Sequence, residues 1–248
     1  MIRRRLFLCT VLLLSGAAFA QEAPDLQALL TELGKTHGIP GAAAALYYDG
    51  QVRQIAVYGV ANADTEEPVT LDTLFQIGSV SKPITATLAY VLSEKGILPV
   101  ESNVFDVFPE LLPESRAEYA HVDIRMLLTH TSGMHYKPLT EPHDAFLDLV
   151  GQDMRKRRYE YTRAALQDKP TGWPGEIYTY GGGTIILAAM MEQVTGRLWE
   201  NLVDEYIFRK LGLDSALPVS AWEGSPKRAW GHTAQGAVSY THLRAHET

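Results

Sequence analysis

Cysteine is almost absent from this 248-residue sequence, which contains a single one, Cys9. Cys9 lies in an N-terminal segment that we expect to be removed, so the remaining chain carries no thiol. Disulfide bonds, cysteine-ligated zinc and a cysteine nucleophile are therefore excluded from the mature chain. Any catalytic group has to be a serine, histidine, lysine, tyrosine or carboxylate side chain.

Long apolar stretches are missing after the first twenty residues. Residues 3–5 are arginines, and they precede an apolar run, Leu6–Ala17, and a small-residue pattern at residues 18–20. This order is typical of a secretory signal peptide. A membrane anchor is the alternative, but the run is shorter than the ~20 residues that span a bilayer. We predict that residues 1–20 are a signal peptide cleaved before Gln21, and that the product is periplasmic or extracellular with no stable membrane span.

Positive charge is also scarce, with 22 Lys and Arg against 29 Asp and Glu and a net charge of -7. Removal of the three arginines of the signal peptide makes the net charge -10. Nucleic-acid binding needs a concentrated basic face, so this balance argues against a nucleic-acid partner. The basic cluster at residues 155–158 lies among polar residues in a connecting region, and we predict that it is a solvated surface segment.

The hydrophobic pattern predicts both helices and antiparallel strands in one domain. Leucines at helical spacing from Leu26 predict a first helix that ends around Gly34. Two β-prone runs, residues 42–48 and 51–58, flank the hairpin-forming dipeptide Asp49-Gly50. Further helices with a buried apolar face are expected at residues 81–95, 124–130, 186–194 and 199–207.

Ser79 and Lys82 form a Ser-x-x-Lys pair at the start of the helix predicted from residue 81. Residues three apart share a helix face, so the Lys82 amine can reach the Ser79 hydroxyl. Serine is a weak nucleophile without a neighbouring base, and lysine can act as that base when burial or nearby charge lowers its pKa. Ser-x-x-Lys is an acyl-transfer pair. Taken alone, the motif favours a chance occurrence in which Ser79 only caps the helix, and its context in the chain reverses this interpretation.

A second segment places Tyr180 directly before the glycines Gly181, Gly182 and Gly183 and a long helix. Glycines allow the backbone to approach a substrate closely. With both segments in place, the chain resembles the serine β-lactamase and penicillin-binding protein family over about residues 25–237. The likeness is greatest to its class C β-lactamases, D-stereospecific peptidases and related esterases.

Four segments carry the resemblance, in the family's order along the chain. Ser79 and Lys82 match the Ser-x-x-Lys motif, and Tyr180 matches the tyrosine of a Tyr-x-Asn motif. Gly59–Ala63, which precedes Thr73–Phe75, is similar to the family's approach to the nucleophile. Leu127–Gly133 is similar to a segment that shapes the region beside the site, which implies a structural role for its histidine, His130, and not that of a general base.

The resemblance implies an α+β fold, in which an antiparallel sheet flanked by helices joins a helical lobe and the site lies between them. It assigns Ser79 as nucleophile, Lys82 as its general-base partner and Tyr180 as proton shuttle, with Gly181 and Gly182 binding substrate. The implied reaction is hydrolysis, through an acyl-enzyme, of a β-lactam, a D-amino-acid peptide or a carboxylic ester. It needs no metal and no organic cofactor, and the oligomeric state stays open.

The sequence departs from the family pattern in two places. Gly182 occupies the asparagine position of Tyr-x-Asn, which removes an amide donor near the substrate and makes β-lactam turnover less certain. No Lys-Thr-Gly or His-x-Gly motif follows Tyr180 in suitable context, because residues 231–233 come too early. Residues 238–248 match a translated sequencing adapter. We therefore expect residues 21–237 to be the N-terminal part of a domain that is incomplete at its C-terminus, and inactive alone.

Two other classes of protein fit some of the same residues. A non-catalytic protein that binds cell-wall peptide, or that is acylated by penicillin without turnover, is made less remote by Gly182. A metal-dependent hydrolase would use His130, His135 and His143, but their spacing fits no familiar zinc signature.

Overall fold

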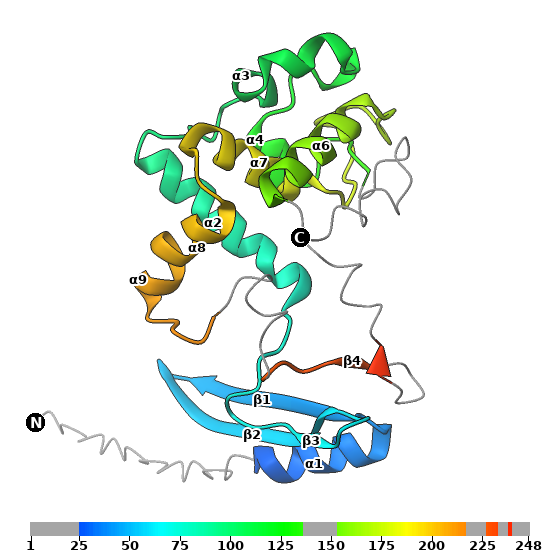
Figure 1. The fold of residues 1–248 in the computed structure, drawn as a ribbon, viewed down its shortest axis with the longest axis vertical. Helices are drawn as coiled ribbons and strands as arrows, with labels where there is room; N and C mark the ends of the chain where they lie inside the picture. Colours follow the sequence, from blue (N-terminus) through cyan, green and yellow to red (C-terminus); the bar gives the residue numbers. More distant parts are fainter. Residues whose placement is uncertain (1–24, 136–152, 217–226, 233–237, 240–248) are drawn as a thin grey trace, which may run out of the picture.

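The computed structural model describes residues 25–135, 153–216, 227–232 and 238–239. The predicted signal peptide, His143 and most of residues 238–248 lie outside this part. Figure 1 shows a small sheet with helix α1 on one side and a larger helical lobe on the other. The predicted combination of an antiparallel sheet with helices and a helical lobe is therefore confirmed.

The sheet is a β-hairpin extended by a short third strand. Strands β1 (Gly41–Tyr48), β2 (Gln51–Asn62) and β3 (Glu67–Pro68) are antiparallel and lie in the order β1-β2-β3. The turn residues Asp49 and Gly50 have φ values of 52° and 72°, as a type I′ hairpin turn requires. The predicted hairpin is confirmed, although β2 continues four residues beyond the predicted end.

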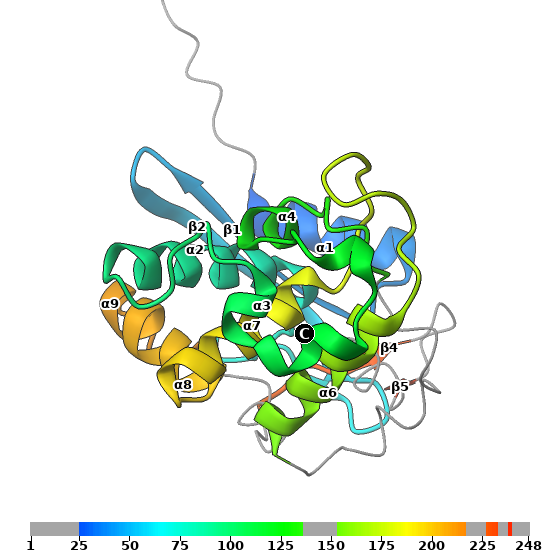
Figure 2. The same ribbon diagram turned by 90° about the horizontal axis from the view of Figure 1, so that it is seen from above.

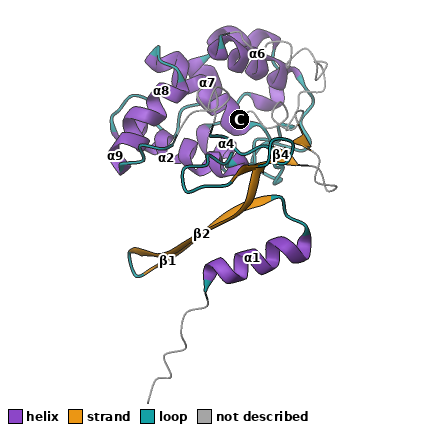
Figure 3. Cartoon of the chain, turned by 60° about the horizontal axis from the view of Figure 1, so that its bottom comes forward, coloured by secondary structure: helices purple, strands orange, loops and turns teal. Residues whose placement is uncertain are grey.

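Helix α1 (Leu26–His37) covers the face of the sheet that points away from the helical lobe, as Figure 3 shows. The predicted end near Gly34 is wrong, because the helix runs on to a left-handed cap at Gly38, with φ 60°. Gly34 is buried instead against β2, where an added Cβ would lie 2.2 Å from the Tyr58 ring. Its missing side chain lets the helix pack closely on the sheet.

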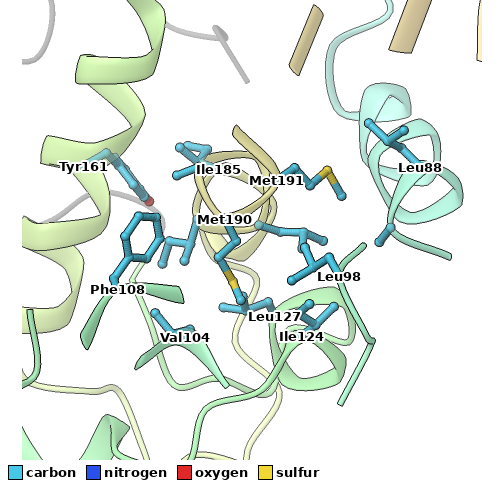
Figure 4. Close-up of a cluster of buried hydrophobic side chains, with 14 of the residues drawn as sticks. Leu88, Leu98, Val104, Phe108, Ile124, Leu127, Tyr161, Ile185, Met190 and Met191 are labelled. Atoms are coloured by element: carbon cyan, nitrogen blue, oxygen red, sulfur yellow. The ribbon is translucent and has the colours of Figure 1, made fainter. Parts of the chain in front are cut away.

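The helical lobe forms around α7 (Gly183–Thr195), whose residues are buried from Gly183 to Glu192. Figure 2 looks onto this lobe and shows α7 near its centre. Figure 4 shows the apolar cluster around α7, including Met190 and Met191. The other α-helices of this lobe in the described residues are α2 (Ser81–Glu94), α3 (Val104–Val107), α4 (Ile124–Leu128), α6 (Met154–Gln167), α8 (Trp199–Val203) and α9 (Arg209–Leu211).

Shorter helical turns connect these elements. They are the 3-10 turns η1 (Gly78–Val80), η2 (Pro109–Glu114) and η3 (Ala117–Tyr119) and the π-helical turn η4 (Asp204–Phe208). The stripe predicted from residue 199 onward is confirmed, since Leu202, Val203 and Ile207 are buried on α8 and η4. No helix in the described ranges combines the length and the apolar character needed to cross a bilayer.

The basic cluster at residues 155–158 is not the solvated connecting segment that we predicted. It lies on α6, where Arg157 is 3% and Arg158 8% exposed. The Arg158 guanidinium pairs with Glu192 of α7 and Glu200 of α8. The prediction failed because the carboxylates that neutralise this cation come from elements far along the chain.

The chain returns to the sheet after the helical lobe. The Leu74 N–H donates to the Lys227 carbonyl, and the Ala229 N–H donates back to the Leu74 carbonyl, both at 2.8 Å. Strand β4 (Gly231–His232) pairs with β5 (Val238–Ser239), and His232 Nε2 accepts the Ala63 N–H at 3.1 Å. The His232 side chain is thus hydrogen-bonded to the residue that follows β2.

Candidate active site

Ser79 lies on a tight turn that leads directly into α2. Gly78 has φ 51°, and the 3-10 turn η1 is closed by the Val80 N–H donating to the Ile77 carbonyl at 3.1 Å. The N-terminal cap of α2 is Val80, and no side chain caps this end. The hypothesis that Ser79 only caps the helix is therefore wrong. Its side chain is left for contacts outside the helix.

The Ser79 hydroxyl is contacted by two proton-bearing groups. Lys82 Nζ donates to Ser79 Oγ at 3.2 Å, and Tyr180 Oη donates to the same oxygen at 2.8 Å. Lys82 Nζ also lies 5.0 Å from the centre of the Tyr180 ring. Lys82 is buried, whereas Ser79 is exposed. The three residues, which were predicted from two separate motifs, therefore meet at the Ser79 hydroxyl.

The surroundings of Tyr180 make its phenol more acidic than usual. Burial opposes ionisation, but hydrogen bonds to Lys82 and Ser79 and the positive charge of Lys82 outweigh it, so the pKa of Tyr180 is lowered. A phenol with a lowered pKa gives up and takes back a proton more readily near neutral pH. This property suits a group that relays protons beside a serine.

The two glycines after Tyr180 are buried, and packing explains their small size. A Cβ on Gly181 would lie 2.3 Å from the Met134 carbonyl oxygen, and a Cβ on Gly182 would lie 1.6 Å from Tyr161 Oη. The Tyr161 hydroxyl thus takes the space in which a side chain at position 182 would begin. Tyr161 was not among the predicted site residues, because nothing in the sequence distinguishes it from any apolar residue of α6. Substrate binding by the two glycines stays a prediction.

His130 lies against Tyr180. Helix α4 ends at Leu128, two residues before the predicted end, and the backbone of His130 is left-handed with φ 59°. The ring centres of His130 and Tyr180 are 4.6 Å apart. Burial and the charge of Lys82 lower the pKa of His130. The expected place of this segment beside the site is therefore confirmed.

Backbone hydrogen bonds join this segment to the tyrosine segment. The Thr179 N–H donates to the His130 carbonyl at 2.7 Å, and the Gly175 N–H donates to the Thr131 carbonyl at 2.7 Å. The Thr171 N–H donates to the Gly133 carbonyl at 2.9 Å. These bonds hold Tyr180 at a fixed position relative to α4 and the core below it.

Two of the histidines that the metal-site alternative would use accept hydrogen bonds from backbone N–H groups. His130 Nδ1 accepts the Gly181 N–H at 3.4 Å, and the His135 carbonyl accepts the Gly182 N–H at 3.5 Å. His143 is outside the described residues. Within the part that the structure describes, no three His, Cys, Asp or Glu side chains are grouped as metal ligands.

Known proteins resemble this chain over most of its length. Penicillin-binding protein 4 of Amycolatopsis lactamdurans is 34% identical over 183 residues, which are 73% of this chain and 45% of that protein. Esterase EstB of Burkholderia gladioli is 29% identical over 208 residues, or 82% of this chain and 53% of that protein. The chain spans about half the length of these relatives.

Comparison of the structures gives the same result. The crystal structure of a D-alanine carboxypeptidase, AmpC, from Burkholderia cenocepacia superposes with a TM-score of 0.64 at 28% identity, covering 89% of this chain and 57% of that one. The likeness confirms the fold implied by the sequence motifs. The sequence profile of the Beta-lactamase family matches residues 26–243, and the chain therefore belongs to the Beta-lactamase family.

Proposed function

We propose that this protein is a serine hydrolase that acts through an acyl-enzyme on Ser79. The observation that carries the proposal is the position of Ser79 Oγ, 3.2 Å from Lys82 Nζ and 2.8 Å from Tyr180 Oη. Three relatives support the proposal by their names: a penicillin-binding protein, a β-lactamase and an esterase. Penicillins, other β-lactams and esters all contain a carbonyl carbon that a serine hydroxyl can attack.

In the acylation step, Ser79 Oγ bonds to the substrate carbonyl carbon while its proton passes to the pair formed by Lys82 and Tyr180, which together carry one proton fewer than the fully protonated pair. The bond from that carbon to the leaving nitrogen or oxygen then breaks. Tyr180 delivers a proton to the leaving group and regains one from Lys82, so that no net proton is lost. The short contacts of both side chains with Ser79 Oγ support this relay.

In the deacylation step, water attacks the ester carbon on Ser79 and gives a proton to the same two groups. The bond from that carbon to Ser79 Oγ then breaks, Oγ takes the proton back, and the carboxylic acid leaves. The negative oxygen formed in both steps needs two N–H donors, one of which is the backbone N–H of Ser79. We propose that the second comes from a later strand, and that residues 21–237 are the N-terminal part of a longer domain. Loss of one such donor costs about 10²- to 10³-fold in rate.

The proposed substrates are carboxylic esters, β-lactams and D-amino-acid peptides. Gly182 offers no side-chain amide to a substrate, and the Tyr161 hydroxyl fills the adjacent space. We expect p-nitrophenyl esters to be turned over faster than β-lactams, because ester cleavage depends least on an extra amide donor. Steady-state rates on p-nitrophenyl butyrate and on a chromogenic cephalosporin compare the two, and faster cephalosporin turnover would contradict this order.

A non-catalytic binder is the second candidate, favoured by the same absence of an amide at position 182. The protein expressed from its complete gene, without residues 1–20, should hydrolyse p-nitrophenyl esters and be labelled by fluorescent penicillin. Ser79→Ala should abolish both signals, and Lys82→Ala should remove most of the turnover. A binder would retain ligand affinity in both variants and would show no turnover.

We also propose that the protein is exported, with residues 1–20 acting as a cleaved signal peptide. The arginines followed by an apolar run and small residues support this. N-terminal sequencing of the protein from a bacterial periplasm should begin at Gln21. A mature protein that begins at Met1 in the cytoplasm would contradict the proposal.

A further inference from the structure

His130 has a backbone conformation that few side chains adopt. Its φ of 59° is left-handed, and the other described non-glycine residues with positive φ are Asp49 and Glu66. Glycine is the usual residue in this conformation just past a helix cap, and histidine is, with asparagine and aspartate, one of the other side chains that adopt it more often than most. What the His130 side chain does in this position follows from its contacts.

The side chain and backbone of His130 together contact three consecutive residues. Its carbonyl accepts the Thr179 N–H at 2.7 Å, its ring lies 4.6 Å from the Tyr180 ring, and its Nδ1 accepts the Gly181 N–H at 3.4 Å. The residue is therefore attached to the chain on both sides of Tyr180 and to the tyrosine itself. Tyr180 Oη in turn lies 2.8 Å from Ser79 Oγ.

We propose that His130 is a positioning residue, which holds the Tyr180 phenol against Ser79 and does so only as a neutral imidazole. The inference rests on the proposed function, since it assigns His130 to the same reaction. Nδ1 can accept the Gly181 N–H only while it carries no proton, which places the ring proton on Nε2. Protonation of Nδ1 would replace an acceptor with a second donor and separate the two groups.

The charges around the ring favour the neutral form. Among the residues that the structure describes, the titratable groups that face it are Lys82 of α2 and the two tyrosines Tyr178 and Tyr180. Burial and the positive charge of Lys82 both lower the pKa of His130 below its usual value of 6.5. Activity that depends on the neutral ring is therefore retained above that lowered pKa and lost as the pH falls through it.

Two substitutions separate the ring contact from the hydrogen bond. His130→Asn tolerates the left-handed backbone and keeps an acceptor, but it removes the ring and the titration. His130→Phe keeps a ring and removes the acceptor. Each should lower kcat for a p-nitrophenyl ester by about 10- to 100-fold, because small displacements of a catalytic group cost this much, while KM stays within about threefold. His121→Asn, the same change at an exposed histidine, is the control and should match the wild type.

The protonation state is measured directly on the unsubstituted protein, which avoids any loss of folding. A long-range ¹H–¹⁵N spectrum of the protein from its complete gene, assigned by the signal that His130→Asn removes, should show an unprotonated Nδ1, a protonated Nε2 and a midpoint below 6.5. A protonated Nδ1 at neutral pH, or a midpoint above 6.5, would overturn the inference.

Failure of the inference can be told apart from failure of the proposed function. If Ser79→Ala abolishes turnover while both His130 variants keep the wild-type kcat, the positioning role is wrong and the serine mechanism stands. If Ser79→Ala retains turnover, the proposed function is wrong, and the role of His130 in it is wrong as well.

Discussion

At the scale of single residues, the Tyr161 hydroxyl occupies the space that a side chain at position 182 would need. A Cβ added to Gly182 would lie 1.6 Å from Tyr161 Oη. The 1.6 Å separation means that no side chain fits at position 182 unless Tyr161 moves. Gly182→Asn, which would restore the family's usual motif, should therefore lower the free energy of unfolding by about 1–3 kcal/mol through overpacking. Urea denaturation of the variant measures this loss.

The double variant Gly182→Asn/Tyr161→Ala tests whether the two positions share one space. Removal of the tyrosine ring should make the asparagine less costly than it is alone, so the two losses should not add. Simple additivity would show that the strain at position 182 comes from elsewhere. Gly175→Asn is unsuitable as a control because Gly175 has φ 89°, whereas Gly182 has φ -80°.

The site residues that were predicted from the sequence belong to short motifs, whereas those that were not predicted are defined by contacts between distant segments. Ser79 and Lys82 stand three positions apart and Tyr180 precedes a glycine run, so each carries a recognisable spacing. The contacts of Tyr161, and those of His130 with Gly181, depend on segments that only the fold brings together. A sequence pattern holds no record of such contacts unless the fold is already known.

At the scale of elements, a buried ion pair joins α6 to α7 and α8. The Arg158 side chain is 10% exposed and that of Glu192 is fully buried. Arg158→Ala would leave Glu192 buried without its cation, which should lower the free energy of unfolding by about 3–5 kcal/mol. Arg163→Ala on the same helix is the matched control. Its side chain and that of its partner Glu114 are 47% and 37% exposed, so loss of the pair should cost at most about 1 kcal/mol.

Chemical denaturation of both variants checks this prediction, and equal losses would contradict the importance of burial for the Arg158 pair.

The difference between local and distant contacts explains why element boundaries and burial were only partly predicted. The hairpin followed from Asp49-Gly50, whose turn preference is local. The packing of α1 at Gly34 and the burial of Arg158 depended on distant partners, Tyr58 and the two carboxylates.

At the scale of the whole molecule, the hairpin presents apolar side chains to solvent. Tyr47, Tyr48, Val52 and Ile55 are each more than half exposed, and β1 is an edge strand in the described sheet. An apolar edge strand is a site for pairing between chains. We predict that the 248-residue chain, expressed alone, forms oligomers or aggregates that light scattering after size exclusion detects.

Charged substitutions on the hairpin test the cause of this association. Val52→Lys/Ile55→Lys should shift the 248-residue chain toward the monomer, whereas Glu32→Lys/Glu94→Lys on exposed helix positions should not. A chain that is monomeric without any substitution would contradict the predicted association.

The central claim is that Ser79 becomes acylated, and mass spectrometry of the trapped intermediate tests it most directly. The protein from its complete gene is mixed with a slowly released β-lactam or ester, quenched in acid, and digested. One adduct, with the mass of the acyl group, is expected on the peptide that contains Ser79, and none is expected in Ser79→Ala. An adduct on another residue, or turnover that persists in Ser79→Ala, would contradict the account.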